Sequence, residues 1–546
     1  MTTAAARNPK AEVQICFDER GAAFFALGFA RATNMPAVLI CTSGTALANY
    51  FPAVIEASKE NVPMIILSAD RPPELRDTGA NQTIDQVKIF DGYVRWQVDF
   101  PCPDEKIEPE FVLSTIDQAV YRALNNPQGP VHLNCMFREP LAPSAQAISE
   151  NYLNRAEKLN NSNRAFTKYF KSVKSVDKQQ IIEIGKEIES TQKGILAVGK
   201  LTCENEIAAV KNLSEKLNWP VFADIRSGLR TGFETEFNIT FYDQLLSAES
   251  FCRQTQPELI LHIGGGFTSK RFYNFIKKYP SQKYIRIANH PYRDDPVHAV
   301  DFRIESSIEY FCAAFNELQK GIFDEKWLEY IIRKNREADK IIGEFVSKER
   351  NVSEISLARY VSENIFEGRG LFLASSMPVR DMDMYAVTKG NKFYIAANRG
   401  ASGIDGTIVS AAGFAKGLKI QTTLITGDLA FLHDMNSLTF LDSDDISLII
   451  IVINNKGGGI FSFLPIAKFE DVFQKYFETP HNYSFSLITE MFGLEYYNPK
   501  YNYDFVEIYN NCQNSNKSVL IEINTDTKEN FSLHKQLQNK IISETG

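Results

Sequence analysis

Two short polar motifs follow apolar runs in the last third of the chain. Gly427-Asp428-Leu429 comes after Thr423-Leu424-Ile425, and Asn454-Asn455 comes after Leu448–Ile453, with glycines at positions 457 to 459. Mg²⁺ prefers near-octahedral oxygen coordination and usually takes one or two protein groups, with phosphate and water supplying the rest. Ligands of open α/β sheets collect at the carboxyl ends of the strands. We therefore predict that Asp428, Asn455 and the carbonyl of Gly457 bind a metal ion that carries a diphosphate.

Each motif also has an ordinary structural interpretation. A Gly-Asp pair after a strand is a common turn, and Asn-Asn-Lys-Gly-Gly is a plausible turn cluster on its own. The occurrence of both motifs, each after a strand-like run, favours the metal–diphosphate interpretation.

Glu19 lies between a predicted strand, Val13–Phe17, and the start of a predicted helix. In a half-buried pocket at a helix entry, desolvation raises the pKa of a carboxyl group, which can then hold a proton near neutrality. Alternatively, Glu19 pairs with Arg20 or complements the helix N-terminus. Residue type alone favours this second interpretation.

Two later loops also follow predicted strands and could contact a ligand. Thr42-Ser43-Gly44 is small enough to let a ligand approach a helix N-terminus closely, or it is an ordinary helix cap. The polar loop Ser68–Gln82 directly follows a strand and suggests a lid over a ligand. Within it, Arg71 could bind a carboxylate through two parallel hydrogen bonds.

The composition is that of an ordinary globular protein, with 44% hydrophobic and 23% charged residues among 546. A net charge of −8 offers no long-range attraction for nucleic acid or anionic lipid. No apolar run approaches the roughly 20 residues of a membrane helix, and we expect no signal peptide, because Met1 to Lys10 lacks an apolar core. The eight cysteines lack Cys-x-x-Cys spacing and the seven histidines lack ligand spacing, so we expect reduced thiols, a cytoplasmic protein and no zinc site.

Strand-like and helix-like segments alternate along the chain, which predicts parallel sheets covered by helices. The first unit has predicted strands at 13–17, 37–41, 64–67 and 131–134, and helices at 22–32 and 45–57. Pro140 to Lys178 is polar and contains Asn160-Asn161-Ser162-Asn163, so we interpret it as a linker. Later predicted strands lie at 194–198, 259–263, 371–374, 424–426 and 447–453, with a charged helix at 324–350.

These units predict an α/β fold with three doubly wound units, at residues 1–145, 178–340 and 350–546. The turn Gly264-Gly265-Gly266-Phe267 lacks the spacing of a dinucleotide-binding motif because Ser269 occupies the last glycine position. We therefore interpret it as a substrate-facing turn that binds neither NAD nor FAD.

The Gly-Asp and Asn-Asn motifs resemble the cofactor signature of thiamine diphosphate-dependent enzymes. Within that superfamily, five segments resemble the 2-succinyl-5-enolpyruvyl-6-hydroxy-3-cyclohexene-1-carboxylate synthases: 17–28, 42–45, 69–82, 398–406 and 457–465. The resemblance runs from about Asp18 to the C-terminus and is weaker in the middle unit. It implies a pyrimidine-binding first unit, a Rossmann-like middle unit and a diphosphate-binding third unit.

The resemblance also implies a reaction. Thiamine diphosphate would attack 2-oxoglutarate, CO₂ would leave, and the succinyl-semialdehyde carbanion would add to isochorismate in a 1,4 sense, in menaquinone or phylloquinone biosynthesis. Another thiamine-dependent decarboxylase or carboligase, or a catalytically impaired form, is the alternative. The implied cofactors are thiamine diphosphate and Mg²⁺, with Mn²⁺ as a substitute. The implied assembly is a homodimer or a dimer of dimers, without nucleic acid or membrane partners.

The resemblance assigns roles to residues of this chain. Glu19 would hydrogen-bond the cofactor's aminopyrimidine ring and favour its imino tautomer. The catalytic residues implied are Glu19, Arg71 and Gln82. Those implied to bind the anionic substrates are Asn81, Lys270, Arg271, Ser375, Ser376, Arg380, Arg399, Phe461 and Leu464. Those implied to bind the cofactor are Thr42, Ser43, Gly44, Ile404, Asp405, Gly406, Gly427, Leu429 and Ile460.

The chain departs from the family pattern at three places. Ser375 stands where the family usually has Asn, and Lys456 replaces a third Asn. Relatives begin with a further strand–helix unit whose Pro-Gly-Ser-Arg turn contributes to the active site. We therefore expect either a start codon upstream of Met1 or a form that folds poorly and has weakened catalysis.

Overall fold

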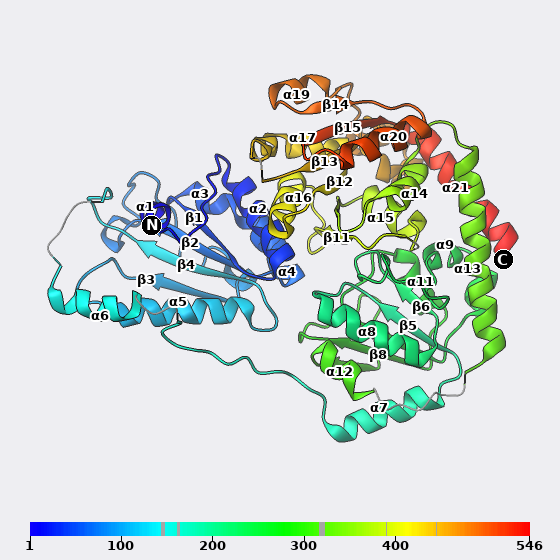
Figure 1. Cartoon of the computed structure of the whole chain (residues 1–546), viewed down its shortest axis with the longest axis horizontal. Coiled ribbons are helices and arrows are strands. Elements are labelled where there is room, and N and C mark those ends of the chain that lie inside the picture. Colours follow the sequence, from blue (N-terminus) through cyan, green and yellow to red (C-terminus); the bar gives the residue numbers. More distant parts are fainter. Residues whose placement is uncertain (144–147, 161–163, 316–322, 389, 444) are drawn as a thin grey trace. The chain divides into compact units, whose positions relative to one another are not determined.

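The computed structural model contains three separate, entirely parallel sheets (Figure 1). It describes residues 1–143, 148–160, 164–315, 323–388, 390–443 and 445–546. The chain forms two compact units. The first contains Met1–Ser172, Asn398–Lys419 and His433–Ile446, and the second contains Val173–Ala397, Ile420–Leu432 and Ser447–Gly546.

The first unit contains a four-stranded sheet in the order β1-β2-β4-β3. Its strands are β1 (Ala37–Cys41), β2 (Met64–Asp70), β3 (Trp96–Phe100) and β4 (Pro130–Met136). Its main helices are α2 (Glu19–Thr33), α3 (Thr45–Asn49), α4 (Phe51–Glu60), α5 (Pro109–Leu124), α6 (Glu150–Asn160) and α16 (Thr407–Leu418). Helix α5 packs on β2, β3 and β4, and α2 packs on β1.

Helices α2 and α16 approach each other closely because glycines line their contact. A Cβ atom at Gly28 would lie 2.0 Å from the carbonyl oxygen of Ser410, and one at Gly413 would lie 2.1 Å from that of Phe25. Larger side chains at either position would force the two helices apart.

The second unit contains the other two sheets. The five-stranded sheet has the order β6-β5-β7-β8-β9, and the six-stranded sheet has the order β11-β10-β12-β13-β15-β14. The strands of the first are β5 (Gly194–Val198), β6 (Val221–Ala223), β7 (Leu259–Ile263), β8 (Lys283–Ala288) and β9 (Phe302–Glu305). Those of the second are β10 (Gly370–Leu373), β11 (Tyr394–Ala397), β12 (Thr422–Gly427), β13 (Leu448–Asn454), β14 (Glu495–Tyr497) and β15 (Val519–Asn524).

Helices surround these sheets, and α13 and α21 run side by side (Figure 1). The helices of this unit include α7 (Lys178–Ser190), α8 (Glu204–Leu217), α9 (Tyr242–Leu245), α10 (Glu249–Gln254), α11 (Lys270–Lys278), α12 (Ile308–Ala314), α13 (Glu325–Lys348), α14 (Glu354–Asn364), α15 (Met377–Tyr385), α17 (Asp428–His433, whose last residue belongs to the first unit), α19 (Ser486–Met491), α20 (Asn502–Gln513) and α21 (Thr527–Thr545). In the part of the chain that the structure describes, no helix is both long and apolar enough to cross a membrane.

Most predicted strands are confirmed, but three local predictions are wrong. Residues 13–17 form no strand, because no described strand pairs with them, and Phe17 is 90% exposed. The single helix predicted at 45–57 is divided at Tyr50, just before Pro52, into α3 and α4. The predicted linker contains helix α6, which ends at Asn160, while residues 161–163 of its asparagine-rich run lie outside the described residues.

Candidate active site

The predicted metal ligands lie at the carboxyl edge of the six-stranded sheet. Strands β12 and β13 pair in parallel with Gly427 opposite Ile453. This register brings Asp428, at the start of α17, beside the loop that follows Asn454. Both strands pair with a neighbour on each side, so their ends are held from two directions.

Asp428 is 2% exposed, and its carboxylate contacts Leu429, Gly457 and His481. Its Oδ1 accepts a hydrogen bond from the Leu429 N–H at 2.6 Å, and its Oδ2 accepts one from the Gly457 N–H at 2.9 Å. The Nε2 atom of His481 lies 3.1 Å from the same Oδ2. Burial raises the pKa of Asp428 above its ordinary value, and these hydrogen bonds oppose that shift.

Asn455 offers an oxygen that suits a hard cation. Its amide Nδ2 donates to Oε1 of Glu354 at 3.3 Å, and its buried Oδ1 has no hydrogen-bond partner among the described residues. The Gly457 carbonyl accepts from the Gly459 N–H at 3.0 Å and keeps a second lone pair. Together with Asp428, these groups form an oxygen donor set of the kind that Mg²⁺ binds.

In the part of the chain that the structure describes, no group of three His, Cys, Asp or Glu side chains could hold a metal ion. The donor set with one carboxylate, one carboxamide and one carbonyl therefore fits a cation that takes its remaining ligands from phosphate and water.

Ile460, predicted to bind the cofactor, and Phe461 and Leu464, predicted to bind the substrates, closely follow the glycines. Ile460 and Phe461 lie in the short 3₁₀ helix Gly459–Phe463 and are half-buried, and the Phe461 ring packs edge-on against Phe477. Leu464 is 43% exposed.

In the first unit, Glu19 is the first residue of α2 and is half-buried. Asp18 caps this helix by accepting the Arg20 N–H at 2.9 Å. Burial raises the pKa of the Cys41 thiol to about 12. Glu19 lies close enough to Cys41 for its charge to add to this shift. The predicted carboxyl group thus lies at the helix start, near the carboxyl end of β1.

The two predicted ligand loops meet beside this strand end. Gly44 has a φ of +86°, and a Cβ atom there would lie 3.3 Å from the Cα of Gln82. The Gly44 N–H donates to the Gln86 side chain at 2.8 Å, and Arg71 Nε donates to the carbonyl of Asn81 at 3.1 Å. Asn81 and Gln82 are exposed, whereas Ser43 is buried.

The segment 399–406 also belongs to the first unit and precedes α16. Gly406 has a φ of +56° and no room for a side chain, since a Cβ atom would lie 2.0 Å from the Phe24 ring. Ile404 is 39% exposed, Asp405 lies 3.9 Å from His433, and Arg399 is half-buried.

The remaining predicted substrate residues lie in the second unit. Arg271, near the start of α11, forms an ion pair with Asp243, whereas Lys270 is exposed. Arg380 lies on α15 and donates to the carbonyl of Ser376, and burial lowers the pKa of its guanidinium. Ser375 is buried directly before this helix.

Sequence reasoning missed three residues at these sites. His481 contacts Asp428, Glu354 contacts Asn455, and Gln86 binds both the Gly44 N–H and the carbonyl of Ala69. Each is far along the chain from the residue it touches and lies in no recognisable motif. Of the histidines, His262 lies within hydrogen-bond distance of Tyr284 and His433 within that of Arg20.

Comparisons with known proteins define the class of this fold and site. Residues 1–89 match the model described as "Thiamine pyrophosphate enzyme, N-terminal TPP binding domain", and residues 379–523 match the C-terminal TPP binding domain. Residues 150–373 match "Middle domain of thiamine pyrophosphate". The fold is similar to a benzoylformate decarboxylase from Polynucleobacter necessarius, with a TM-score of 0.69, 16% identity and coverage of 95% of this chain and 92% of that one. The chain is therefore a thiamine pyrophosphate enzyme.

The curated relatives narrow this class to one family. The chain is 44% identical over 99% of its length to a 2-succinyl-5-enolpyruvyl-6-hydroxy-3-cyclohexene-1-carboxylate synthase from Prosthecochloris aestuarii, of which 92% is covered. It is 41% identical over 98% of its length to the synthase of the same name from Rubrobacter xylanophilus, again with 92% covered. The chain belongs to the family of 2-succinyl-5-enolpyruvyl-6-hydroxy-3-cyclohexene-1-carboxylate synthases.

Proposed function

We propose that this enzyme decarboxylates 2-oxoglutarate on thiamine diphosphate and joins the remaining four-carbon unit to isochorismate by 1,4-addition. The product is 2-succinyl-5-enolpyruvyl-6-hydroxy-3-cyclohexene-1-carboxylate, an intermediate of menaquinone or phylloquinone synthesis. The observation that carries the proposal is the oxygen donor set at the ends of β12 and β13, in a chain 44% identical to a synthase of this name.

The cofactor supplies, when bound, the nucleophilic carbon and the electron sink that permit loss of CO₂. We assign the binding of Mg²⁺ (or Mn²⁺) and the diphosphate to Asp428, Asn455 and the carbonyl of Gly457. The buried, unpartnered Oδ1 of Asn455 supports this assignment, since a cation would satisfy it.

We assign the proton chemistry to Glu19, whose carboxyl would hydrogen-bond the aminopyrimidine ring. Its place at the half-buried start of α2, beside the end of β1, supports this role. The guanidinium groups of Arg71, Arg271, Arg380 and Arg399 would bind the carboxylates of the two substrates, because a planar guanidinium can bond both oxygens of a carboxylate.

We further propose that the enzyme is a cytoplasmic homodimer or dimer of dimers. Eight free cysteines support a reducing compartment. Large apolar side chains on the surface, such as Phe17 at 90% exposure and Met491 at 80%, support burial against a second copy.

The proposal is tested by incubating the purified chain with thiamine diphosphate, Mg²⁺, 2-oxoglutarate and isochorismate. We expect isochorismate absorbance to disappear in step with CO₂ release, and pyruvate in place of 2-oxoglutarate to give neither. Release of CO₂ without consumption of isochorismate would identify another thiamine-dependent decarboxylase or carboligase. The absence of both would overturn the proposal.

A further inference from the structure

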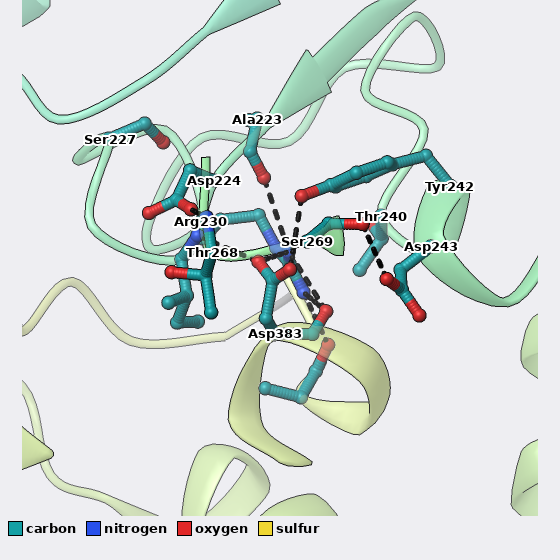
Figure 2. A network of polar contacts seen from close by, with 12 residues as sticks. Ala223, Asp224, Ser227, Arg230, Thr240, Tyr242, Asp243, Thr268, Ser269 and Asp383 are labelled. Carbon is teal, nitrogen blue, oxygen red and sulfur yellow. Dashed lines mark hydrogen bonds and ion pairs between the residues drawn. The ribbon is translucent and has the colours of Figure 1, made fainter. Parts of the chain in front are cut away.

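A buried polar network joins helix α15 to the residues that follow β6 (Figure 2). Its centre is Asp383 on α15, which Arg230 and Tyr242 approach from different elements. All three side chains are at most 1% exposed. Buried charged groups are costly unless paired and hydrogen-bonded, so this network holds one arrangement strongly.

The carboxylate of Asp383 is well satisfied. Its Oδ1 accepts the Ile225 N–H at 2.9 Å and lies 3.4 Å from Nη1 of Arg230. Its Oδ2 accepts the hydroxyl of Tyr242 at 3.0 Å. Burial raises the pKa of Asp383 above its ordinary value. Asparagine has nearly the same shape and keeps one acceptor oxygen, so Asp383→Asn is the conservative replacement at this position.

Arg230 holds the end of the same helix. It donates to the main-chain carbonyls of Asp383 and Ala386 at 3.2 Å each, and to that of Ala223 at 3.2 Å. The last carbonyls of a helix lack partners within the helix and favour a nearby positive charge. Arg230 therefore ties the C-terminal turn of α15 to the end of β6.

The helix held in this way carries Arg380, one of the cationic residues of the proposed substrate site in this unit, and contacts a second one, Arg271. Arg380 lies one turn before Asp383, and its Nη1 donates to the carbonyl of Ser376. Arg271, from α11, has its Nη1 3.7 Å from Sδ of Met384 on α15 and is paired with Asp243. The position of α15 thus sets where Arg380 lies, and Met384 on the same helix contacts the guanidinium group of Arg271.

We propose that Asp383 and Arg230 are positioning residues, which fix α15 so that Arg380 and Arg271 meet the same carboxylate substrate. This inference rests on the proposed function, because it takes both arginines as substrate-binding groups. Displacement of a binding group by about 1 Å can cost on the order of 100-fold in rate, so loosening α15 should weaken the use of substrate.

The first test compares Asp383→Ala, Asp383→Asn and Tyr242→Phe with a matched control, Tyr509→Phe. Tyr509 is also fully buried and its hydroxyl lies 2.9 Å from Oγ1 of Thr423, but it makes no hydrogen bond to α15 among the described residues. We expect Asp383→Ala to raise the KM of at least one carboxylate substrate about 10-fold or more, with thiamine diphosphate affinity changed less than about twofold. Asp383→Asn should restore most of this loss, and Tyr509→Phe should leave KM unchanged.

The second test is a double-mutant cycle with Arg380→Gln. If Asp383 acts through Arg380, Asp383→Ala should raise KM much less in the Arg380→Gln background than in wild type. Independent, multiplicative effects, or a KM for Asp383→Ala no higher than that of Tyr509→Phe, would overturn the inference.

Hydrogen exchange of the α15 amides tests this inference without relying on enzyme activity, and therefore independently of the proposed function. We expect faster exchange in residues 377–385 of Asp383→Ala than in those of Tyr509→Phe. A wild-type enzyme that consumed neither substrate would refute the proposed function alone, and the exchange data would then decide whether α15 is held by this network. Unchanged exchange of α15 in Asp383→Ala would overturn the inference whatever the activity.

Discussion

The proposed metal site at the ends of β12 and β13, in the second unit, and the Glu19 region of the first unit are built in different ways. Strands β12 and β13 lie inside a six-stranded sheet and are almost wholly buried, so their register determines where Asp428 and Asn455 lie. Glu19 follows a segment with no strand partner among the described residues, and β1 lies at the edge of its sheet. We therefore expect substitutions far from the site to disturb Asp428 and Asn455, whose positions depend on sheet register, less than they disturb Glu19, whose position depends on one helix start.

The largest expected effect concerns Asp428, a proposed ligand of the metal ion. Asp428→Ala should weaken Mg²⁺-dependent binding of thiamine diphosphate by more than about 100-fold, since loss of even a supporting group at a metal site costs about 10- to 100-fold. Titration calorimetry with and without Mg²⁺ measures this. Asp471→Ala, which removes an exposed carboxylate from the same unit, is the control. Equal affinity in both variants would refute the metal assignment.

The next largest effect concerns the Glu19 region. Glu19→Gln should lower kcat by about 10²- to 10⁴-fold, because general acid–base groups contribute on that order. Cofactor affinity should change little, since Glu19 is assigned to proton transfer. Steady-state kinetics with Glu12→Gln, an exposed glutamate nearby in sequence, provides the comparison. A Glu19→Gln enzyme with wild-type kcat would contradict this role.

A steric change in the first unit should have a smaller effect, on stability. Gly28→Ala should reduce the free energy of unfolding by about 1–3 kcal/mol, because the new methyl group would meet the Ser410 carbonyl at the contact of α2 and α16. Urea denaturation measures the loss. Gly92→Ala is the control, since a Cβ atom there meets nothing within 4 Å. Similar stability of the two variants would show that α2 and α16 do not pack as described.

The smallest expected effect is a pH dependence of stability that arises from Asp434 in the first unit. Asp434 accepts the N–H groups of Ile408 and Val409, at the start of α16, and burial raises its pKa to about 6. A carboxyl whose pKa is higher in the folded state binds more protons when folded, so its contribution to stability falls as the pH rises from about 4 to about 6. Asp434→Asn should lack this decline in urea denaturation at the two pH values. If the stability of Asp434→Asn declined between the two pH values as much as that of wild type, Asp434 would not be the source of the decline.

Much of the fold could be predicted because buried parallel strands are continuous apolar runs. Residues 37–41, 194–198 and 259–263 form β1, β5 and β7 with the predicted bounds. The strand-like segment at 13–17 was misassigned because a strand also needs a partner, which the sequence pattern does not reveal. Strand β3 was not predicted, since Trp96-Gln97-Val98-Asp99-Phe100 alternates polar and apolar residues over only a short edge.

The site could be predicted where a motif follows a strand, and not where contacts are distant in sequence. Asp428 and Asn455 were predicted together because neighbouring parallel strands share one edge. His481 and Glu354 approach those residues from a later loop and from the start of α14, so only the folded chain reveals them. The same holds for Arg230, whose pairing with Asp383 depends on the packing of α15.

A crystal structure with thiamine diphosphate and Mg²⁺ bound would test the metal assignment most directly. We expect one octahedral Mg²⁺ with a carboxylate oxygen of Asp428, Oδ1 of Asn455 and the carbonyl oxygen of Gly457 at about 2.0–2.1 Å, and diphosphate oxygens among its other ligands. A bound cofactor whose diphosphate lies away from the ends of β12 and β13, with no cation between residues 428 and 455, would contradict the assignment.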